Sequence, residues 1–99
     1  MENVQLILNE NGRGVFLIEE NNEKLAEMEI SVKGSNLTSY HTETFEKGKG
    51  RGLGRLLMET MADYARKNNL KVIALCPFVH SQFKRYADKY ADIWNQEVS

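Results

Sequence analysis

A glycine-rich, basic stretch occupies residues 46–55, near the middle of the 99-residue chain. It reads Glu-Lys-Gly-Lys-Gly-Arg-Gly-Leu-Gly-Arg, so that every second residue from Gly48 to Gly54 is glycine. A turn of this kind before a helix presents free backbone N–H groups and the positive end of the helix dipole. Glycine also tolerates positive φ and lets a ligand approach the backbone closely. The stretch therefore predicts a site for a phosphate or pyrophosphate group.

The spacing of this loop excludes two common phosphate-binding motifs. No Gly-Lys-Ser/Thr sequence is present, as a Walker-type loop requires. A dinucleotide fingerprint would place its third glycine at residue 53 or 55, where the chain has Leu53 and Arg55. A simpler interpretation is that the stretch is only a solvated connection between a strand and a helix. Ordering four glycines on folding costs much conformational entropy, however, which argues against that role alone. The basic side chains expected to steer and screen phosphate charge are Lys47, Lys49, Arg51 and Arg55.

Three side chains outside the loop could carry acid–base or nucleophilic chemistry. Cys76 is the one cysteine, directly before the one proline, Pro77. A thiolate is a nucleophile, although most free cysteines behave as small buried hydrophobic residues. His41 and Glu43 share one face of a strand by alternation, and either is a candidate base for an ammonium group. The only other histidine is His80, so we expect no metal site.

Composition restricts the class of protein. A chain of 99 residues with 41% hydrophobic side chains is expected to form one domain over residues 1–99. The net charge of −1 gives no reason to expect nucleic acid or membrane as a partner. RNA binding through the basic loop lacks stacking aromatics other than Phe45. We expect no membrane span and no signal peptide, and a lone thiol predicts a cytoplasmic location.

The first half of the chain has the pattern of β-strands. Alternation and β-branched or aromatic residues predict strands over residues 4–8, 15–19, 24–33 and 37–45. The turns between them are short, and Asn11-Gly12 is a strong hairpin signal. These strands are predicted to form a four-stranded antiparallel meander.

The second half changes to a helical period. Apolar residues recur every three or four positions between Leu53 and Lys67, and Asn68-Asn69 can cap that helix. A nearly all-apolar strand follows over residues 70–75, so this part predicts a βαβ unit with the fifth strand parallel to the fourth. Residues 78–94 predict one C-terminal helix. Its expected core-facing residues are Phe83, Tyr86, Ala87, Tyr90 and Trp94.

Three segments together resemble a known family. The run from Lys49 to Gly54, between a fourth strand and a long helix, resembles the acetyl-CoA signature of the GNAT superfamily of N-acetyltransferases, although Lys49 stands where Gln or Arg is usual. The flanking runs His41-Thr42-Glu43-Thr44 and Leu75-Cys76-Pro77-Phe78 look like a minimal, single-domain GNAT-like subfamily. The resemblance covers about residues 15–94 and implies an α+β, GNAT-like fold.

The resemblance also implies where acetyl-CoA would bind. The pyrophosphate would lie on the backbone amides of Lys49, Gly50, Arg51, Gly52, Leu53 and Gly54. The pantetheine arm would run where the fourth and fifth strands diverge, along Thr42, Thr44 and Phe45. Cys76 would then lie near the thioester, as a cofactor contact and as a candidate acyl acceptor or acid–base group.

The resulting expectation is an N-acetyltransferase in which an unidentified amine attacks acetyl-CoA directly. The alternative is a non-catalytic acyl-CoA-binding or sensing module, because the connection between the first two strands is only a turn where larger family members have helices. The acceptor site would then be shallow or shared with a partner, in a monomer or weak dimer. The usual tyrosine general acid has no clear counterpart; Tyr86 and Tyr90 are the nearest by order. The N-terminal third of the chain is acidic. Its carboxylates either form a solvated face of the sheet or give the protein an electrostatic preference for a cationic amine substrate.

Overall fold

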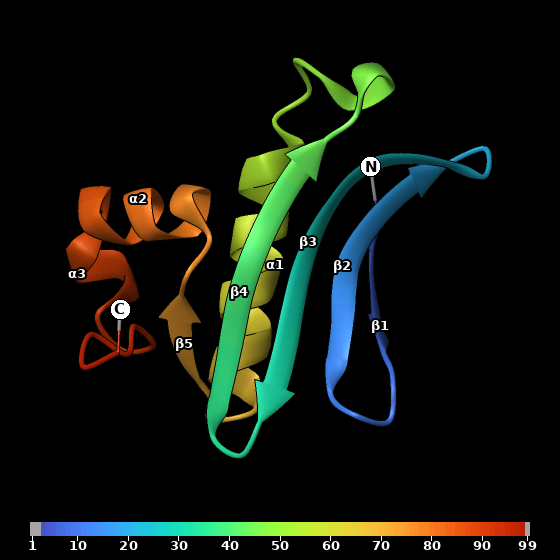
Figure 1. Cartoon of the computed structure of the whole chain (residues 1–99). Coiled ribbons are helices and arrows are strands. Elements are labelled where there is room, and N and C mark those ends of the chain that lie inside the picture. The colour runs from blue at the N-terminus through green and yellow to red at the C-terminus, as the bar shows by residue number, and fades with distance from the viewer. Residues whose placement is uncertain (1–2, 99) are drawn as a thin grey trace.

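One five-stranded sheet organises the molecule, with its strands in sequence order (Figure 1). The computed structural model describes residues 3–98. The strands are β1 (Val4–Leu8), β2 (Arg13–Glu20), β3 (Glu23–Lys33), β4 (Asn36–Thr44) and β5 (Lys71–Ala74). The helices are a short 3₁₀ turn η1 (Glu46–Gly48), α1 (Leu53–Lys67), α2 (Pro77–Arg85) and α3 (Ala87–Tyr90).

The first four strands form the predicted antiparallel meander. Its turns use residues that accept positive φ: Gly12 at 82°, Asn21 at 54°, Asn22 at 64° and Gly34 at 59°. Two successive positive-φ residues between β2 and β3 match the right-handed twist of a hairpin. The side chain of Asn9 closes the first hairpin by accepting hydrogen bonds from the N–H groups of Asn11 and Arg13.

Helix α1 connects β4 to β5, which pairs with β4 in parallel as the sequence predicts. The helix lies behind the sheet in Figure 1 and buries its apolar stripe against it. That stripe consists of Leu53, Leu57, Met58, Met61, Ala62 and Ala65. The other face of the sheet carries no helix in the described part of the chain. The α+β fold of the sequence analysis is therefore confirmed.

A β-bulge at Tyr40 interrupts the regular alternation of β4. The pairing of β3 with β4 shifts here, because Glu29 lies opposite His41 while the next residue, Ile30, lies opposite Ser39. Tyr40 is the extra residue, and a hydrogen bond of 2.8 Å joins its hydroxyl to Ser31. A bulge bends its strand and increases the local twist. The upper part of β4 is thereby turned relative to the part that pairs with β5.

The prediction of one continuous C-terminal helix is wrong. Helix α2 ends at Arg85, and Tyr86 has a non-helical backbone (φ −119°, ψ 49°) before the four-residue α3. Tyr86 is 38% exposed and leaves the predicted stripe, whereas Phe83 still packs on Tyr90 and Trp94 with ring centroids 5.1 and 5.4 Å away.

The free edge of β5 explains the break in the helix. The N–H of Val72 donates to Ile93 O (2.6 Å), and the N–H of Asn95 donates to Val72 O (2.9 Å). A longer helix would leave these edge groups without a protein partner, so the chain extends along the edge instead.

Candidate functional site

The glycine loop leads from β4 into α1 with a backbone that glycine makes accessible. Gly50 and Gly52 have positive φ values of 79° and 70°, and Gly52 is the N-cap of α1. A Cβ atom at either position would meet no atom within 4 Å, so their backbone conformation rather than crowding demands glycine. The surface above these two residues is open to a ligand.

The other two glycines of the loop lie against neighbouring parts of the chain. A Cβ atom at Gly48 would collide with the carbonyl of Leu25. A Cβ at Gly54 would lie 3.4 Å from the ring of Phe78, so the first turn of α1 touches the start of α2. This contact brings together the glycine loop and the Cys76-Pro77-Phe78 segment, which are more than twenty residues apart in sequence.

The N-terminus of α1 can bind an anion. The first N–H groups of a helix have no intrahelical acceptor. Within residues 3–98 no side chain caps α1, and its first turn carries no acidic residue. The helix dipole adds positive potential at this point. A phosphate group fits this arrangement of backbone donors.

The four basic side chains of the loop each lie beside a carboxylate. Lys47 Nζ is 2.7 Å from Glu23 and Arg51 is 3.3 Å from Glu20, while Lys49 and Arg55 pair at 3.7 and 3.5 Å with Glu46 and Glu59. The hydrogen bond from Lys47 to Glu23 raises the pKa of Lys47. Surface pairs of this kind are weak and salt-sensitive, so a phosphate can compete for these cations.

Strands β4 and β5 separate near the middle of β4. Their pairing ends at Ser39 and Ala74, and the Ser39 carbonyl accepts hydrogen bonds from both Leu75 (3.1 Å) and Cys76 (2.8 Å). Pro77 then starts α2, whereas β4 continues to Thr44. Beyond Ser39, β4 therefore has no strand partner on its β5 side among the described residues.

The backbone of Thr42 and Thr44 points into this gap. The N–H of Phe45 donates to Leu25 O at 2.8 Å, so Phe45 faces β3. Successive residues of a strand direct their N–H and C=O groups to opposite sides. Glu43 therefore also faces β3, and the main-chain groups of Thr42 and Thr44 face the side that β5 leaves open. These groups can hydrogen-bond an extended, amide-containing ligand arm.

Cys76 lies at the same gap, on the helix-covered side of the sheet. Its thiol is buried and lies 3.3 Å from the hydroxyl of Thr42. The predicted cofactor contacts Thr42 and Cys76 therefore meet in the structure. Ser39 precedes the bulge on the same strand and is also buried. Its hydroxyl has no hydrogen-bond partner within the described chain.

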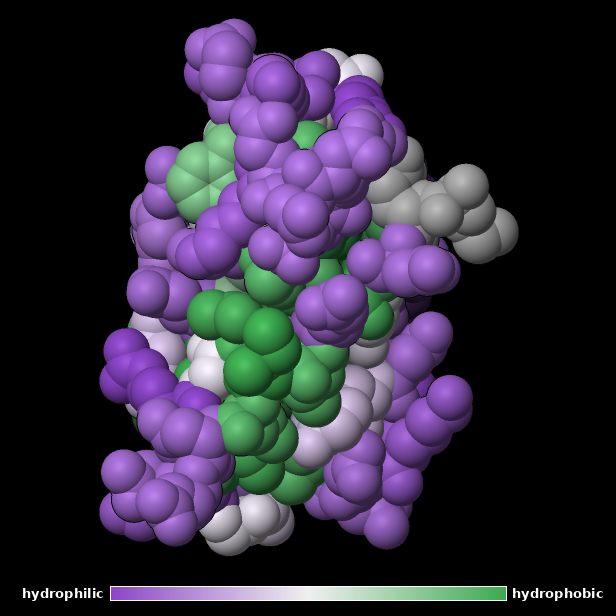
Figure 2. Space-filling view, turned by 90° about the vertical axis from the view of Figure 1, so that its right-hand side faces the viewer, coloured by the Kyte–Doolittle hydropathy of each residue, from purple (hydrophilic) through white to green (hydrophobic). Residues whose placement is uncertain are grey.

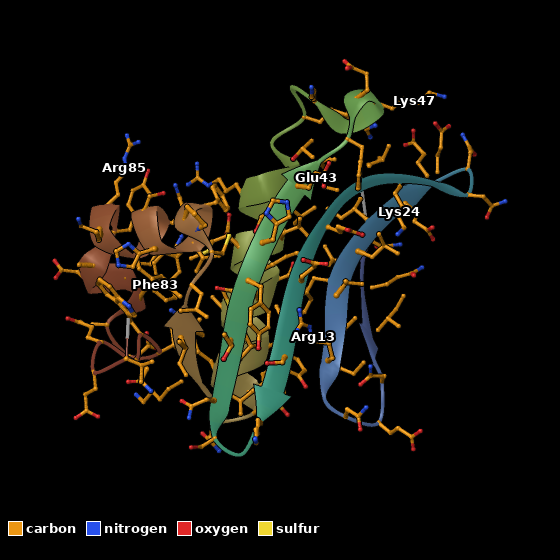
Figure 3. All side chains as sticks on the ribbon, in the orientation of Figure 1. Arg13, Lys24, Glu43, Lys47, Phe83 and Arg85 are labelled. Carbon is orange, nitrogen blue, oxygen red and sulfur yellow. The ribbon has the colours of Figure 1, made fainter. Side chains whose placement is uncertain are left out.

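His41 and Glu43 lie on the opposite, open face of β4, as alternation predicts. The imidazole Nε2 is 3.7 Å from Glu43 Oε1, and both side chains are about half exposed. Glu43 and Lys47 lie at the same end of the sheet (Figure 3). In the described structure no hydrogen bond joins either residue to Cys76. The sheet therefore separates the three predicted catalytic side chains into a thiol on one face and an acid–base pair on the other.

Two features of this site carry weak or no signals in the sequence. The bulge at Tyr40 depends on pairing with β3, and no residue type in β4 marks it. The contact of Phe78 with Gly54 depends on the position of α2.

Among residues 3–98 no group of three or more His, Cys, Asp or Glu side chains could hold a metal ion. No helix in that range is both long and apolar enough to cross a membrane.

An antiparallel meander, a glycine loop at a helix N-terminus and a fifth strand that diverges from the fourth define the GNAT class of acetyltransferase folds. The profile of the GCN5-related N-acetyl-transferase family matches residues 15–93. A solution NMR structure of a GCN5-like candidate N-acetyltransferase from Staphylococcus aureus is similar, with a TM-score of 0.65 and 29% sequence identity over 95% of this chain and 90% of that one. A search of curated proteins gives no match. The chain belongs to the GCN5-related N-acetyltransferase family, whose members typically use acetyl-CoA.

Proposed function

We propose that this chain transfers an acetyl group from acetyl-CoA to the nitrogen of an amine. The observation that carries the proposal is the gap beside β4, where no strand of the described chain pairs with the β5 side of Thr42 and Thr44. The N-terminus of α1 lies at the same end of β4, so one extended ligand could reach both. The residues that would hold acetyl-CoA are Thr42, Thr44, Cys76 and the loop from Lys47 to Arg55. The main chain of Phe45, also expected to contact the pantetheine arm, faces β3 instead, because its N–H donates to Leu25 O.

Two chemical routes fit the arrangement of the side chains. In the direct route, the amine nitrogen attacks the thioester carbonyl, the C–S bond breaks, and CoA leaves as a thiolate that is protonated. His41 or Glu43, on the open face, would accept the proton that the amine loses. In the second route, the thiol of Cys76 takes the acetyl group first and releases CoA, and the amine then attacks that new thioester.

Binding is tested by titrating the pure protein with acetyl-CoA and following backbone amide shifts by NMR. We expect the largest shifts at residues 49–54 and at Thr42 and Thr44. The absence of shifts in the loop at millimolar ligand would contradict the proposal. Mass spectrometry after incubation separates the two routes, because only the second leaves an acetyl group on Cys76, and a Cys76→Ser variant would lose that label.

The shape of the β1–β2 connection favours a second candidate function, a non-catalytic acyl-CoA-binding module. This connection is a tight turn closed by the hydrogen bond from Gly12 N to Asn9 O (3.0 Å), so it builds no wall for an acceptor pocket. Incubation with acetyl-CoA and a panel of amines distinguishes the two functions. Release of free CoA that depends on an added amine supports the transferase, whereas binding without release supports the module.

The open face beside the gap suggests a cationic acceptor. Glu27 lies directly opposite Glu43, and Glu29 lies opposite His41. Carboxylates on neighbouring strands attract an amine that carries a second positive charge. We expect diamines to be acetylated with a lower KM than monoamines of the same length, and Glu43→Gln to reduce that difference. An equal KM for both amines would refute the cationic preference and leave acetyl transfer itself untouched.

A further inference from the structure

The two edges of the sheet are treated differently by the chain. The outer edge of β5 is covered, because Val72 hydrogen-bonds to Ile93 and Asn95 of the C-terminal segment. Strand β1 pairs with β2 on one side, and no segment of residues 3–98 pairs with its other side. An unpaired edge offers a row of N–H and C=O groups to another strand.

Strand β1 also lacks the features that normally protect a sheet edge. Its sequence Val-Gln-Leu-Ile-Leu contains no charge and no proline, and its pairing with β2 contains no bulge. Ile7 is 51% exposed and Leu8 is 38% exposed. Figure 2 views this side of the molecule and shows a continuous apolar patch ringed by hydrophilic residues. Charges, prolines and bulges on an edge oppose pairing between chains, so their absence leaves this edge available.

The backbone directions determine how another strand could pair with β1. The N–H of Asn9 donates to Arg13 O at 2.8 Å, so Asn9 faces β2. By alternation Ile7 and Gln5 also face β2, and the N–H and C=O groups of Val4, Leu6 and Leu8 face outward. The side chains of these three residues lie on the helix-covered face, because their partners on β2 are Ile18, Phe16 and Gly14.

We propose that two copies of this chain associate by antiparallel pairing of their β1 strands around a two-fold axis at Leu6. This register places Leu6 opposite the partner's Leu6 and Val4 opposite the partner's Leu8. Each outward-facing residue then meets an outward-facing residue on the same face of the sheet, as antiparallel pairing requires. The three residue pairs (4 with 8, 6 with 6 and 8 with 4) would each exchange two hydrogen bonds, which gives about six main-chain hydrogen bonds between the chains. The result is one sheet that runs through both copies.

A hollow beside β1 matches the side chains that a second copy would bring. It has a volume of about 290 Å³ and lies between the strand and α1. Its lining combines Val4, Leu6, Phe16 and Tyr64 with the polar residues Thr60, Asp63 and Lys67. An added β1 strand would place its own Val4, Leu6 and Leu8 on this covered face, next to the hollow. Apolar side chains from the partner would therefore extend the core rather than remain in water.

Charge favours a second copy over a strongly charged partner. The strand presents no charged side chain that would select an acidic or a basic peptide, and in self-pairing no like charges of β1 meet. A two-fold axis also uses the same patch on both copies, which is the commonest arrangement of homodimers. Five residues per chain form a small interface, so we expect a weak dimer that dissociates on dilution.

The test is sedimentation of the full chain from about 10 μM to about 1 mM, combined with amide hydrogen exchange by NMR. We expect the average mass to rise from 11.4 kDa toward twice that value. The amides of Val4, Leu6 and Leu8 should exchange more slowly at the higher concentration, whereas those of Gln5 and Ile7 are already bonded to β2 and should not change. The proposal would be overturned if the average mass stayed at that of a single chain at every concentration. It would also be overturned if the exchange rate of the Leu6 amide did not depend on concentration.

Two variants check the interface and its register. Ile7→Lys should weaken association at least about ten-fold, and Leu75→Lys, at an equally exposed position (55%) beyond β5, should not. Because the register places residue 7 opposite the partner's residue 5, a mixture of Ile7→Lys with Gln5→Glu should associate more tightly than either variant alone. Equal effects of the two lysine substitutions would argue against β1 as the interface, and a mixture that does not associate would argue against this register.

Discussion

Replacing Gly52 by alanine separates the two reasons for glycine in the loop, which are conformation and access. Gly52 has φ +70°, and a Cβ atom there meets nothing within 4 Å. The cost to folding is therefore conformational strain alone. The left-handed conformation costs alanine about 1–2 kcal/mol, and the stiffer unfolded chain returns about 0.4–1 kcal/mol. The expected net loss of stability is about 1 kcal/mol, which lowers the Tm of a domain of this size by about 4–8 °C.

The effect on ligand binding should be larger. Gly52 is the N-cap of α1, so a methyl group and a strained backbone there would disturb the first N–H groups of the helix, where a phosphate would approach. Loss of one hydrogen bond to a charged group costs about 1.5–3 kcal/mol, so acetyl-CoA should bind about ten- to a hundred-fold more weakly. Isothermal calorimetry measures this loss, and thermal unfolding measures the change in stability.

Gly34 provides a matched control for this experiment. It also has positive φ (59°) and open space around its Cβ position, but it lies in the β3–β4 turn, at the opposite end of β4 from the loop. Gly34→Ala should lower the Tm by a similar amount and leave acetyl-CoA binding unchanged. Unchanged binding in Gly52→Ala, or equal loss of binding in both variants, would refute the assignment of the loop as the phosphate site.

Three further predictions concern the thiol, the core and pH. Thr42→Val removes the hydroxyl 3.3 Å from Cys76 and should change the rate at which the thiol reacts with iodoacetamide; an unchanged rate would show that this contact does not control the thiol. Leu57 is fully buried in α1, and Leu57→Ala should destabilise the fold by about 2–5 kcal/mol in urea unfolding, whereas a loss below about 1 kcal/mol would contradict its place in the core. Hydrogen bonds from Arg66 (2.8 and 3.2 Å) lower the pKa of Asp92 and raise that of Arg66. Because the carboxylate is stabilised in the folded state, its contribution is present above its unfolded pKa of about 3.9 and is lost as pH falls. Asp92→Asn should therefore cost about 0.5–1 kcal/mol at neutral pH, allowing for solvent screening, and little near pH 3; a difference independent of pH would contradict this.

Much of the fold follows from local patterns in the sequence. The amphipathic period of α1, the asparagines and glycines at turns and the apolar run of β5 each depend on neighbouring residues only. The C-terminus shows where this reasoning fails. Phe83, Tyr90 and Trp94 have helical spacing and do pack together. Residues 91–95 nevertheless run along the edge of β5, because Val72 donates a hydrogen bond to Ile93 O and accepts one from Asn95 N.

The candidate site divides in the same way. The sequence by itself determined the glycine loop, its position before α1 and the shared face of His41 and Glu43, because spacing and alternation are local properties. Only the tertiary structure decided the bulge at Tyr40, the meeting of Thr42 with Cys76 and the separation of that thiol from His41. These features depend on which distant strands pair and where the pairing stops. The end of the β4–β5 ladder at Ser39 leaves the main chain of Thr42 and Thr44 open to a ligand, and no local signal in β4 marks that position.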